Sequence, residues 1–288
     1  MSGFSSYWLG LREPADNLAR DAGLVAALAD ALPDRQAVAV VDLGCGTGSN
    51  LRALAPHLPP RQAWTLIDHD PVLLAAARET LAAWADQAEA EGEDLVLDKG
   101  GKRLRVTFAS LDLAAEPARA LDSAPDLITA AALFDLVSRD WLDRFVAAVA
   151  AAAATFYTAL SYDGTETWHP PHPADAAMQA AFLGHQGGDK GFGAALGPGA
   201  TAALAEAFSR HGYVVRTAAS PWHLGPDQGD LIGLLKAGKA QAVRETGLVH
   251  SDHVEEWEAA RGAPGTTVVI GHADLLAQLA SAGREHPP

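Results

Sequence analysis

The sequence has little cysteine, little positive charge and few long apolar runs. Cys45 is the only cysteine among 288 residues, which excludes a disulfide within the chain and a zinc site built from several thiolates. The 21 Lys and Arg residues face 36 Asp and Glu residues, and the net charge of -15 repels nucleic-acid phosphates and anionic membrane surfaces. The alanine-rich run 146–154 is too short to span a bilayer.

These absences narrow the class of protein. The N-terminal residues lack the basic segment and apolar core of an export signal, so we expect a cytoplasmic protein. Hydrophobic residues make up 49% of the chain, which is enough for a sizeable core. We expect a small-molecule substrate and neither a nucleic-acid nor a membrane partner, and the sequence gives no indication of the oligomeric state.

Segments of strand and helix character alternate along the chain. Helices are predicted at 14–32 (ending before Pro33), 49–58, 71–90, 140–152, 199–212 and 251–262, and strands at 37–43, 63–68, 103–110, 124–133, 155–162, 213–220 and 229–238. The stretch 266–279 fits neither pattern clearly. The alternation predicts an α/β fold with a doubly wound, Rossmann-like, seven-stranded sheet. The last two predicted strands follow each other without a helix, so one of them should run antiparallel.

The chain divides into three predicted segments. Residues 1–35 form an N-terminal helical cap, 36–246 form the main domain, and 247–288 form a C-terminal extension. Residues 163–199 are rich in Gly, Pro, His and aromatic residues, at a place where a connection is normally short. We therefore predict that this insertion is a lid over the site.

The stretch VVDLGCGTGSN, residues 40–50, is the clearest chemical signal. A strand ends in Asp42 and is followed by Gly44, Gly46 and Gly48, a pattern that lets the backbone turn tightly and approach a ligand closely. The spacing differs from the dinucleotide fingerprint, whose third glycine would fall at Ser49. This disfavours NAD. Packing as a small hydrophobe is the expected role of the cysteine inside the loop.

A second acid follows in LIDHDP, where Asp68 closes the next strand at a position suited to accept both hydroxyls of a ribose. VVDLGCGTGSN and LIDHDP together resemble the first and second motifs of the class I S-adenosylmethionine-dependent methyltransferases. The resemblance covers roughly residues 36–238 in architecture, and its specific motifs are two short segments. It implies S-adenosylmethionine as the cofactor. The implied cofactor-binding residues are Asp42, Gly44, Gly46, Gly48, Asp68, His69, Asp112, Ala130 and Ala131.

Within this set the resemblance assigns distinct roles. The three glycines approach the methionine end of the cofactor, Asp68 holds its ribose, and Asp112 accepts a hydrogen bond from the adenine amine. Residues 130–134 would lie beside the sulfonium. The segment TAAALFDL lacks the Asn/Asp-Pro-Pro-aromatic signature of DNA amino-methyltransferases, so methylation of a nucleic-acid base is disfavoured.

The acceptor site is less well marked. Candidate general bases are His185, then His169 and His223, because a neutral imidazole accepts a proton near neutral pH. Candidate substrate-binding residues come from the N-terminus, the strand at 155–162 and the lid: Tyr7, Trp8, Arg12, Tyr162, Trp168, Asp189 and Lys190. Phe192 is predicted to exclude water. His169, His172, His185 and Asp189 could supply metal ligands, but loop histidines more often form hydrogen bonds, and we expect no metal.

The sequence therefore predicts a methyltransferase that acts on an oxygen or nitrogen of a small molecule. Two alternatives stay open. A related enzyme can transfer an aminopropyl group instead, and a noncatalytic regulatory or assembly protein can keep the cofactor loop while its acceptor pocket is filled. A methylated product separates both alternatives from the main hypothesis.

Overall fold

A computed structural model describes residues 5–32 and 36–279. The predicted helix stop at Pro33 and the last residues of the predicted C-terminal extension lie outside this range. Within it the helices are α1 (Ser6–Ala19), α2 (Ala22–Asp30), α3 (Ser49–Leu54), α4 (Pro71–Trp84), α5 (Arg139–Ala151), α6 (Asp175–Gln186), α7 (Ala200–Arg210), α8 (Gly229–Thr246) and α9 (Ser251–Arg261). The strands are β1 (Ala37–Leu43), β2 (Arg61–Asp68), β3 (Gln87–Glu91), β4 (Asp94–Lys99), β5 (Lys102–Ser110), β6 (Leu127–Ala131), β7 (Thr155–His169), β8 (Tyr213–Ala219), β9 (Trp222–Leu224) and β10 (Thr267–Leu279).

All of these strands join one sheet, in the order β3-β4-β5-β2-β1-β6-β7-β10-β8, with β9 also paired to β10. Strands β5, β2, β1, β6 and β7 are mutually parallel, and β10 runs antiparallel between β7 and β8. The predicted fold class is therefore confirmed: seven central strands form a mostly parallel sheet with one antiparallel strand. The additional strands are the edge hairpin β3-β4 and the short β9.

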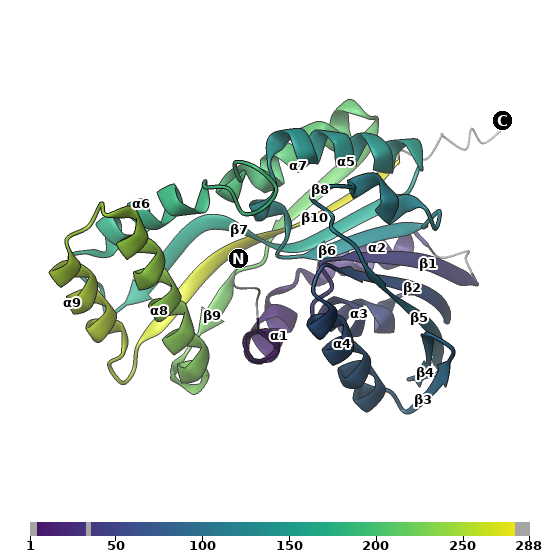
Figure 1. The fold of residues 1–288 in the computed structure, drawn as a ribbon, viewed down its shortest axis with the longest axis horizontal. Coiled ribbons are helices and arrows are strands. Elements are labelled where there is room, and N and C mark those ends of the chain that lie inside the picture. Colours follow the sequence, from purple (N-terminus) through teal and green to yellow (C-terminus); the bar gives the residue numbers. More distant parts are fainter. Residues whose placement is uncertain (1–4, 33–35, 280–288) are drawn as a thin grey trace, which may run out of the picture.

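Helices cover both faces of the sheet, as the doubly wound prediction requires (Figure 1). Helices α5 and α7 pack on one face, where Trp141, Phe145 and Phe208 belong to one buried cluster. Helices α2, α3 and α4 pack on the other face, where Leu28 and Leu81 belong to a second buried cluster. Both faces of the sheet are thus covered by helices.

The antiparallel strand is not the predicted one. One of the predicted strands 213–220 and 229–238 was expected to form it, but residues 229–238 belong to helix α8, and β10 supplies the antiparallel strand from the unassigned stretch. Buried side chains in α8 recur at helical spacing, at Leu231, Ile232, Lys239, Ala240 and Val243, and this periodicity overrides the apolar run that suggested a strand. The division into cap, main domain and extension stays a prediction, although β10 gives the C-terminal segment a place inside the sheet.

Three further boundaries differ from the prediction. The helix predicted at 14–32 is two helices, because Asp21 caps the start of α2 by accepting the Leu24 N–H at 2.7 Å. The helix predicted at 71–90 ends at Trp84. Strands β3 and β4 follow as a hairpin, with Gly92 (φ 65°) in the turn between them. The predicted insertion 163–199 begins as the outer part of β7 and continues as α6 before it becomes a loop.

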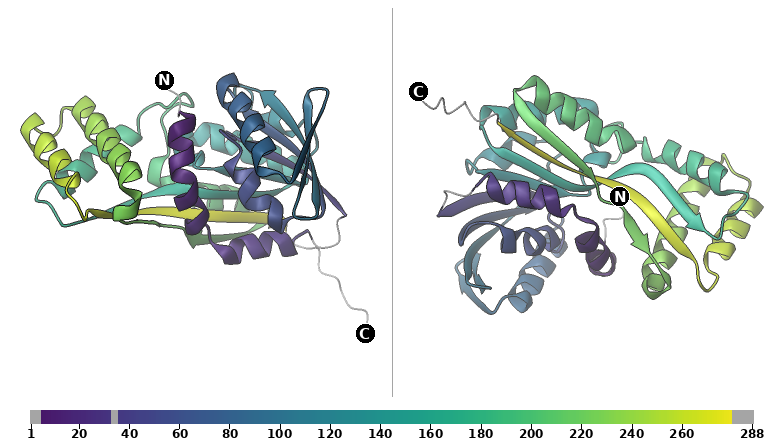
Figure 2. Two further views of the ribbon diagram at one scale, coloured as in Figure 1. Left: turned by 90° about the horizontal axis from the view of Figure 1, so that it is seen from below. Right: turned by 180° about the vertical axis from the view of Figure 1, so that it is seen from behind.

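Strands β7 and β10 extend past the rest of the sheet and carry a separate group of helices (Figure 1). We call this group the distal lobe: α6, α8 and α9 with residues 163–169 of β7 and 267–270 of β10. Helix α1 stands between α8 of the distal lobe and helices α3 and α4 of the sheet (Figure 2). The N-terminal helix therefore joins the two halves of the molecule at the edge where the parallel strands end.

Candidate active site

The glycine loop, residues 44–48, connects β1 to α3. Gly44, Gly46 and Gly48 have φ values of 62°, 52° and 77°, a left-handed region that other L-residues enter only at a cost. The Cys45 N–H donates to the Ile67 carbonyl at 2.9 Å, which fixes the loop beside the end of β2. The three glycines are thus required by the backbone path itself.

Asp68, the last residue of β2, is bonded to this loop. Its carboxylate accepts the Gly46 N–H at 2.9 Å and the Asp70 N–H at 3.0 Å, and the residue is 5% exposed. The Nδ1 atom of His69 lies 3.4 Å from Asp68 Oδ1, and the His69 ring is exposed. A carboxylate offers about four lone-pair positions, so Asp68 keeps acceptor capacity for ligand hydroxyls.

Asp42 lies beneath the loop and is fully buried. The Asn50 amide donates to Asp42 Oδ1 at 2.7 Å and also to Thr129 Oγ1 at 3.0 Å, which ties α3 to β1 and β6. Oδ2 of Asp42 has no hydrogen-bond partner. Burial raises the pKa of Asp42 to about 7. Asp42 therefore supports the loop from below.

The other predicted cofactor residues lie at the same edge. Ala130 pairs with Leu43 across β6 and β1, so the ends of these two strands are level, and Ala131 follows it. Asp112 lies in the exposed loop after β5, and its carboxylate accepts the Ala114 N–H at 2.9 Å. The structure thus brings all nine predicted cofactor residues to the carboxyl ends of β1, β2, β5 and β6, which is where ligands bind in open α/β sheets.

Helix α1 covers the glycine loop. The Cδ1 atom of Leu9 lies 2.8 Å from the position that a Cβ on Gly46 would take. Glu13 forms an ion pair with Arg52 of α3 at 2.5 Å, and Arg52 also donates to the Thr47 carbonyl at 2.7 Å. A side chain at position 46 would therefore collide with the helix that closes the site.

The other face of α1 builds a polar cluster, which consists of Arg12, Asp16, Asp135, Trp222 and His272. Arg12 donates to both oxygens of Asp16, at 2.9 and 3.1 Å, and its guanidinium lies 5.0 Å from the centre of the Trp222 ring. The Trp222 indole N–H donates to Asp16 at 3.1 Å, and the Trp222 and His272 rings lie 4.9 Å apart. Asp16 and Trp222, which are 206 positions apart in the chain, thus meet at this helix.

Two members of this cluster have unused hydrogen-bonding atoms. Asp135 is 8% exposed and its Oδ1 has no partner, while His272 is 6% exposed and its Nδ1 has none. Burial raises the pKa of Asp135 to about 6, and Arg12 opposes this rise. Burial, and then the nearby charge of Arg12, lower the pKa of His272 to about 4. Arg12 therefore acts electrostatically on both residues.

Sequence reasoning missed Asp135, Trp222 and His272. Asp135 follows the segment 130–134 that the resemblance placed beside the sulfonium, and an acid at that point was an available signal. His272 lies in the stretch that fitted no pattern, and only the pairing of β10 with β7 brings it opposite Tyr162. Its proximity to the site could not be read from the sequence.

Two of the predicted substrate residues lie in or beside the polar cluster. Arg12 belongs to it, and the Tyr162 ring lies 6.2 Å from that of His272. Trp8 is half-buried on α1 and its indole N–H has no partner, whereas Tyr7 is 62% exposed. Trp168 is buried in the distal lobe, 5.3 Å from the Trp257 ring.

The glycine-rich part of the predicted lid folds back on itself. Asp189 accepts the N–H groups of Gly191 and Gly193 at 2.7 and 3.0 Å. Lys190 lies 3.4 Å from His185, and Phe192 packs edge-on against Trp141 of α5 at 5.4 Å. The segment thus lies against the start of α5, and its role as a lid stays a prediction.

The structure does not bring the three candidate histidine bases together. His185, at the end of α6, pairs with Glu245 at 2.9 Å. His169 is exposed at the far end of β7, ten residues and roughly 33 Å of strand beyond Ala159 at the sheet edge. His223 is exposed on β9 and lines a groove of about 640 Å³ between α1 and the start of α8. Their catalytic role stays a prediction.

Among residues 5–32 and 36–279, no group of three or more His, Cys, Asp or Glu side chains is placed to hold a metal ion. Within the same ranges, no helix is both long and apolar enough to cross a membrane.

Comparison with solved structures shows the fold. The chain is 16% identical to a cyclopropane-fatty-acyl-phospholipid synthase-like protein from Lactobacillus casei, with a TM-score of 0.55 over 95% of this chain and 94% of that one. Two further structures match with lower TM-scores. One is the cyclopropane synthase MmaA2 from Mycobacterium tuberculosis (11% identity, 96% and 95% coverage, TM-score 0.48). The other is an S-adenosylmethionine-dependent methyltransferase from Thiobacillus denitrificans (15% identity, 95% and 98% coverage, TM-score 0.42). No curated protein matches the sequence.

The family comparison concerns the site itself. Residues 41–164 match the model of a methyltransferase domain family, and this segment contains the glycine loop, Asp68 and Asp135. The residues present fit S-adenosylmethionine, since three left-handed glycines leave the backbone bare beside a carboxylate with spare acceptor capacity. The match and the sheet order together show that residues 41–164 are a methyltransferase domain of the class I S-adenosylmethionine-dependent type, whose cofactor is S-adenosylmethionine.

Proposed function

We propose that this chain methylates an oxygen or nitrogen atom of a small molecule. The observation that carries the proposal is the contact between the Gly46 N–H and Asp68, because it holds a bare loop and a ribose-binding carboxylate in one place. S-adenosylmethionine supplies a methyl group on a sulfonium, which is an electrophile. The protein then has to align the acceptor and keep water away from it.

We assign roles to the predicted residues as part of this proposal. The glycine loop binds the methionine end, Asp68 accepts hydrogen bonds from the ribose, and Asp112 accepts one from the adenine amine. Ala130 and Ala131 line the wall beside the sulfonium, because they end the strand next to β1. Helix α1 closes the site through Leu9 and brings Arg12 to the acceptor side.

The same closure favours one alternative. The Leu9 side chain lies directly against Gly46. A noncatalytic protein whose pocket is filled by its own side chains would show the same kind of contact. No observed contact favours aminopropyl transfer over methyl transfer.

Transfer of label separates these possibilities. The purified chain is incubated with S-adenosylmethionine carrying a labelled methyl group and with a small-molecule extract, and products are analysed by mass. The proposal expects labelled products heavier than their precursors by one methylene group, together with S-adenosylhomocysteine. Binding of S-adenosylhomocysteine without any product supports the noncatalytic alternative. A product heavier by an aminopropyl group, in a parallel incubation with decarboxylated S-adenosylmethionine, supports the other.

A further inference from the structure

Asp135 is a buried carboxylate with no assigned use. It lies in the turn of residues 134–136 directly after β6, and the preceding Leu133 has its Cδ1 3.6 Å from the position of a Cβ on Gly44. Asp135 is therefore two positions along the chain from Leu133, whose side chain contacts the glycine loop. Its Oδ1 has no hydrogen-bond partner among the described residues, although an isolated buried carboxylate is costly. An arrangement of this kind is stable when a ligand satisfies the free oxygen.

The charge around Asp135 favours a cationic ligand. The cluster contains one cation, Arg12, and two of its nitrogens already donate to Asp16. Asp135 adds a second carboxylate, which interacts electrostatically with Arg12. One positive side chain is thus outnumbered by the carboxylates of Asp16 and Asp135, in a chain whose net charge is -15. An anionic acceptor would be repelled from this place, and a cationic one would be attracted.

The number of free acceptor atoms also distinguishes between ligands. Oδ1 of Asp135 and Nδ1 of His272 are both buried and both without partners. The His272 ring is neutral near pH 7, so its unprotonated nitrogen can accept a hydrogen bond. An alcohol presents one O–H, whereas the ammonium form of an amine presents two or three N–H groups. One ammonium nitrogen can donate to two acceptors at once, whereas a single hydroxyl cannot.

We propose that Asp135 and His272 form the acceptor subsite of this methyltransferase, and that the methyl acceptor is a small primary or secondary amine. The inference rests on the proposed function and names the substrate class of the same site. The ammonium group donates one N–H to Asp135 Oδ1 and another to His272 Nδ1. The His272 ring lies 4.9 Å from the Trp222 ring and 6.2 Å from the Tyr162 ring.

Methyl transfer to the amine requires that the ammonium group first loses one proton. Asp135 Oδ1 takes a proton from the ammonium group, which frees the nitrogen lone pair. That lone pair forms the new bond to the methyl carbon while the carbon–sulfur electron pair returns to sulfur, which leaves as a neutral thioether. The raised pKa of Asp135, about 6, makes it a stronger proton acceptor than an ordinary carboxylate while leaving it mostly ionised at pH 7.

The test uses matched pairs of small molecules with labelled S-adenosylmethionine. Ethanolamine is compared with ethylene glycol, benzylamine with benzyl alcohol, and pyrrolidine with tetrahydrofuran. We expect methyl transfer to one or more of the amines and none to the oxygen compounds. Transfer to an alcohol at a rate equal to that of its amine overturns the inference, as does a wild-type protein that binds S-adenosylhomocysteine and methylates none of the six compounds.

Variants assign the role to Asp135. Asp135→Asn keeps the shape but removes the proton acceptor, and we expect its amine turnover to fall roughly 100-fold while its S-adenosylhomocysteine affinity stays unchanged. His272→Gln is expected to raise the amine KM more than it lowers kcat. His211→Gln, an exposed substitution at the end of α7, serves as the control with wild-type rates.

These outcomes are distinguishable from failure of the proposed function. A wild-type protein that does not bind S-adenosylhomocysteine contradicts both claims. A wild-type protein that methylates an amine, with Asp135→Asn equally active, contradicts only the assignment of the subsite. Should His272→Gln fail to fold, Asp135→Asn still decides the question, because it exchanges one side-chain oxygen for an amide nitrogen.

Discussion

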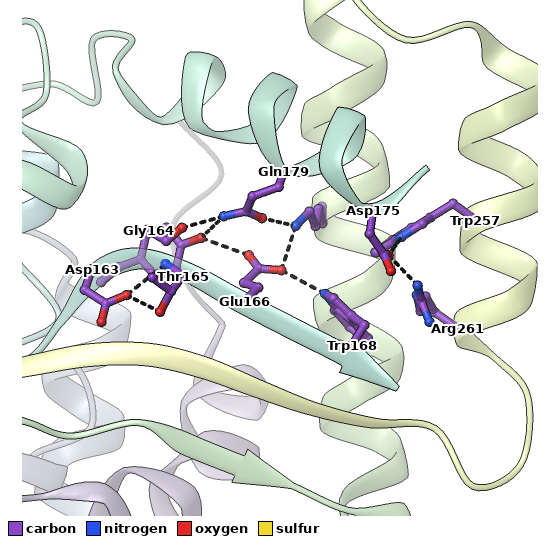
Figure 3. Close-up of polar contacts among 11 residues, drawn as sticks. Asp163, Gly164, Thr165, Glu166, Trp168, Asp175, Gln179, Trp257 and Arg261 are labelled. Carbon is purple, nitrogen blue, oxygen red and sulfur yellow. Dashed lines mark hydrogen bonds and ion pairs between the residues drawn. The ribbon is translucent and has the colours of Figure 1, made fainter. Parts of the chain in front are cut away.

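Buried carboxylates in the distal lobe and buried carboxylates near the glycine loop differ in how many of their oxygens have hydrogen-bond partners. In the distal lobe, Glu166 accepts hydrogen bonds on both oxygens, from Tyr162 at 3.0 Å, from Trp168 at 2.9 Å and from Lys239 at 2.6 Å (Figure 3). At the sheet edge, Asp42 and Asp135 each keep one oxygen without a partner.

A second carboxylate in the distal lobe follows the same rule as Glu166. Asp175 at the start of α6 accepts from the Trp257 indole at 2.7 Å and from Arg261 on one oxygen, and from the His172 N–H at 2.7 Å on the other (Figure 3). Saturated polar groups of this kind fix helices in place. An unpaired buried oxygen such as Oδ1 of Asp135 leaves an acceptor atom for a ligand.

The largest expected effect is on the distal lobe. Lys239→Met leaves Glu166 buried without its cation, and we expect the free energy of unfolding to fall by about 3–5 kcal/mol. The double variant Lys239→Met/Glu166→Gln should recover much of this loss, because it removes both charges. Denaturant titration followed by circular dichroism measures both. A single variant as stable as the wild type would mean that the pair does not hold the lobe.

The next effect concerns Asp42 and pH. Its pKa of about 7 in the folded protein lies above the ordinary value near 4, so the folded state retains a proton that the unfolded state releases. The free energy of unfolding therefore falls as the pH rises from about 4 to about 7. Asn does not titrate, and Asp42→Asn should gain stability over the wild type across this window, by up to about 4 kcal/mol.

Other buried groups titrate in the same window. Asp135 has the same sign as Asp42, and His272 has the opposite sign, since its lowered pKa costs stability as the pH falls below about 6.5. These contributions are common to both proteins and cancel in the difference. Thermal unfolding of the pair at a series of pH values gives that difference, and a constant value would contradict the raised pKa.

A smaller effect is expected at Gly46. Gly46→Ala puts a Cβ into a left-handed residue and against Leu9, and we expect S-adenosylhomocysteine to bind about tenfold more weakly, equal to about 1.4 kcal/mol. Gly10→Ala on the exposed side of α1 is the matched control, because nothing lies within 4 Å of its Cβ position. Calorimetric titration checks both variants. Equal weakening by the control would shift the cause from the loop to the helix.

The smallest effect is expected for an exposed charge. Arg210 pairs with Glu206 and Asp143, both at 2.9 Å, on the solvent side of α7 and α5. Exposed pairs of this kind contribute little, so Arg210→Ala should leave the denaturation midpoint unchanged within error. A shift as large as that of Lys239→Met would remove the distinction between buried and exposed charge.

The sequence predicted the parts of the fold that depend on neighbouring residues. Asp42, the three glycines and Asp68 identify the glycine loop because a strand end, a positive φ and the next strand end are local properties. The strand β10 was not predicted, because His272, Asp274 and Gln278 interrupt its apolar pattern. Asp274 is buried only because the Asp21 and Leu160 N–H groups, far away in the chain, donate to it at 3.0 and 2.9 Å.

The same limit applies to the candidate site. Arg12 was named from its place in an unexplained N-terminal segment, but its contact with Trp222 depends on β9 joining β10. Gly271 is close-packed, with Thr165 Oγ1 only 2.0 Å from its Cβ position, and no spacing in the sequence signals this. Side chains that meet through the pairing of distant strands require the topology before their roles can be inferred.

Calorimetric titration of S-adenosylhomocysteine into the wild type, Asp68→Asn and Lys239→Met tests the central claim most directly. The account predicts that the wild type binds, that Asp68→Asn binds at least about tenfold more weakly because charged hydrogen bonds to the ribose are lost, and that Lys239→Met, while folded, binds like the wild type. Equal affinity for the wild type and Asp68→Asn, or no binding to the wild type, would contradict it.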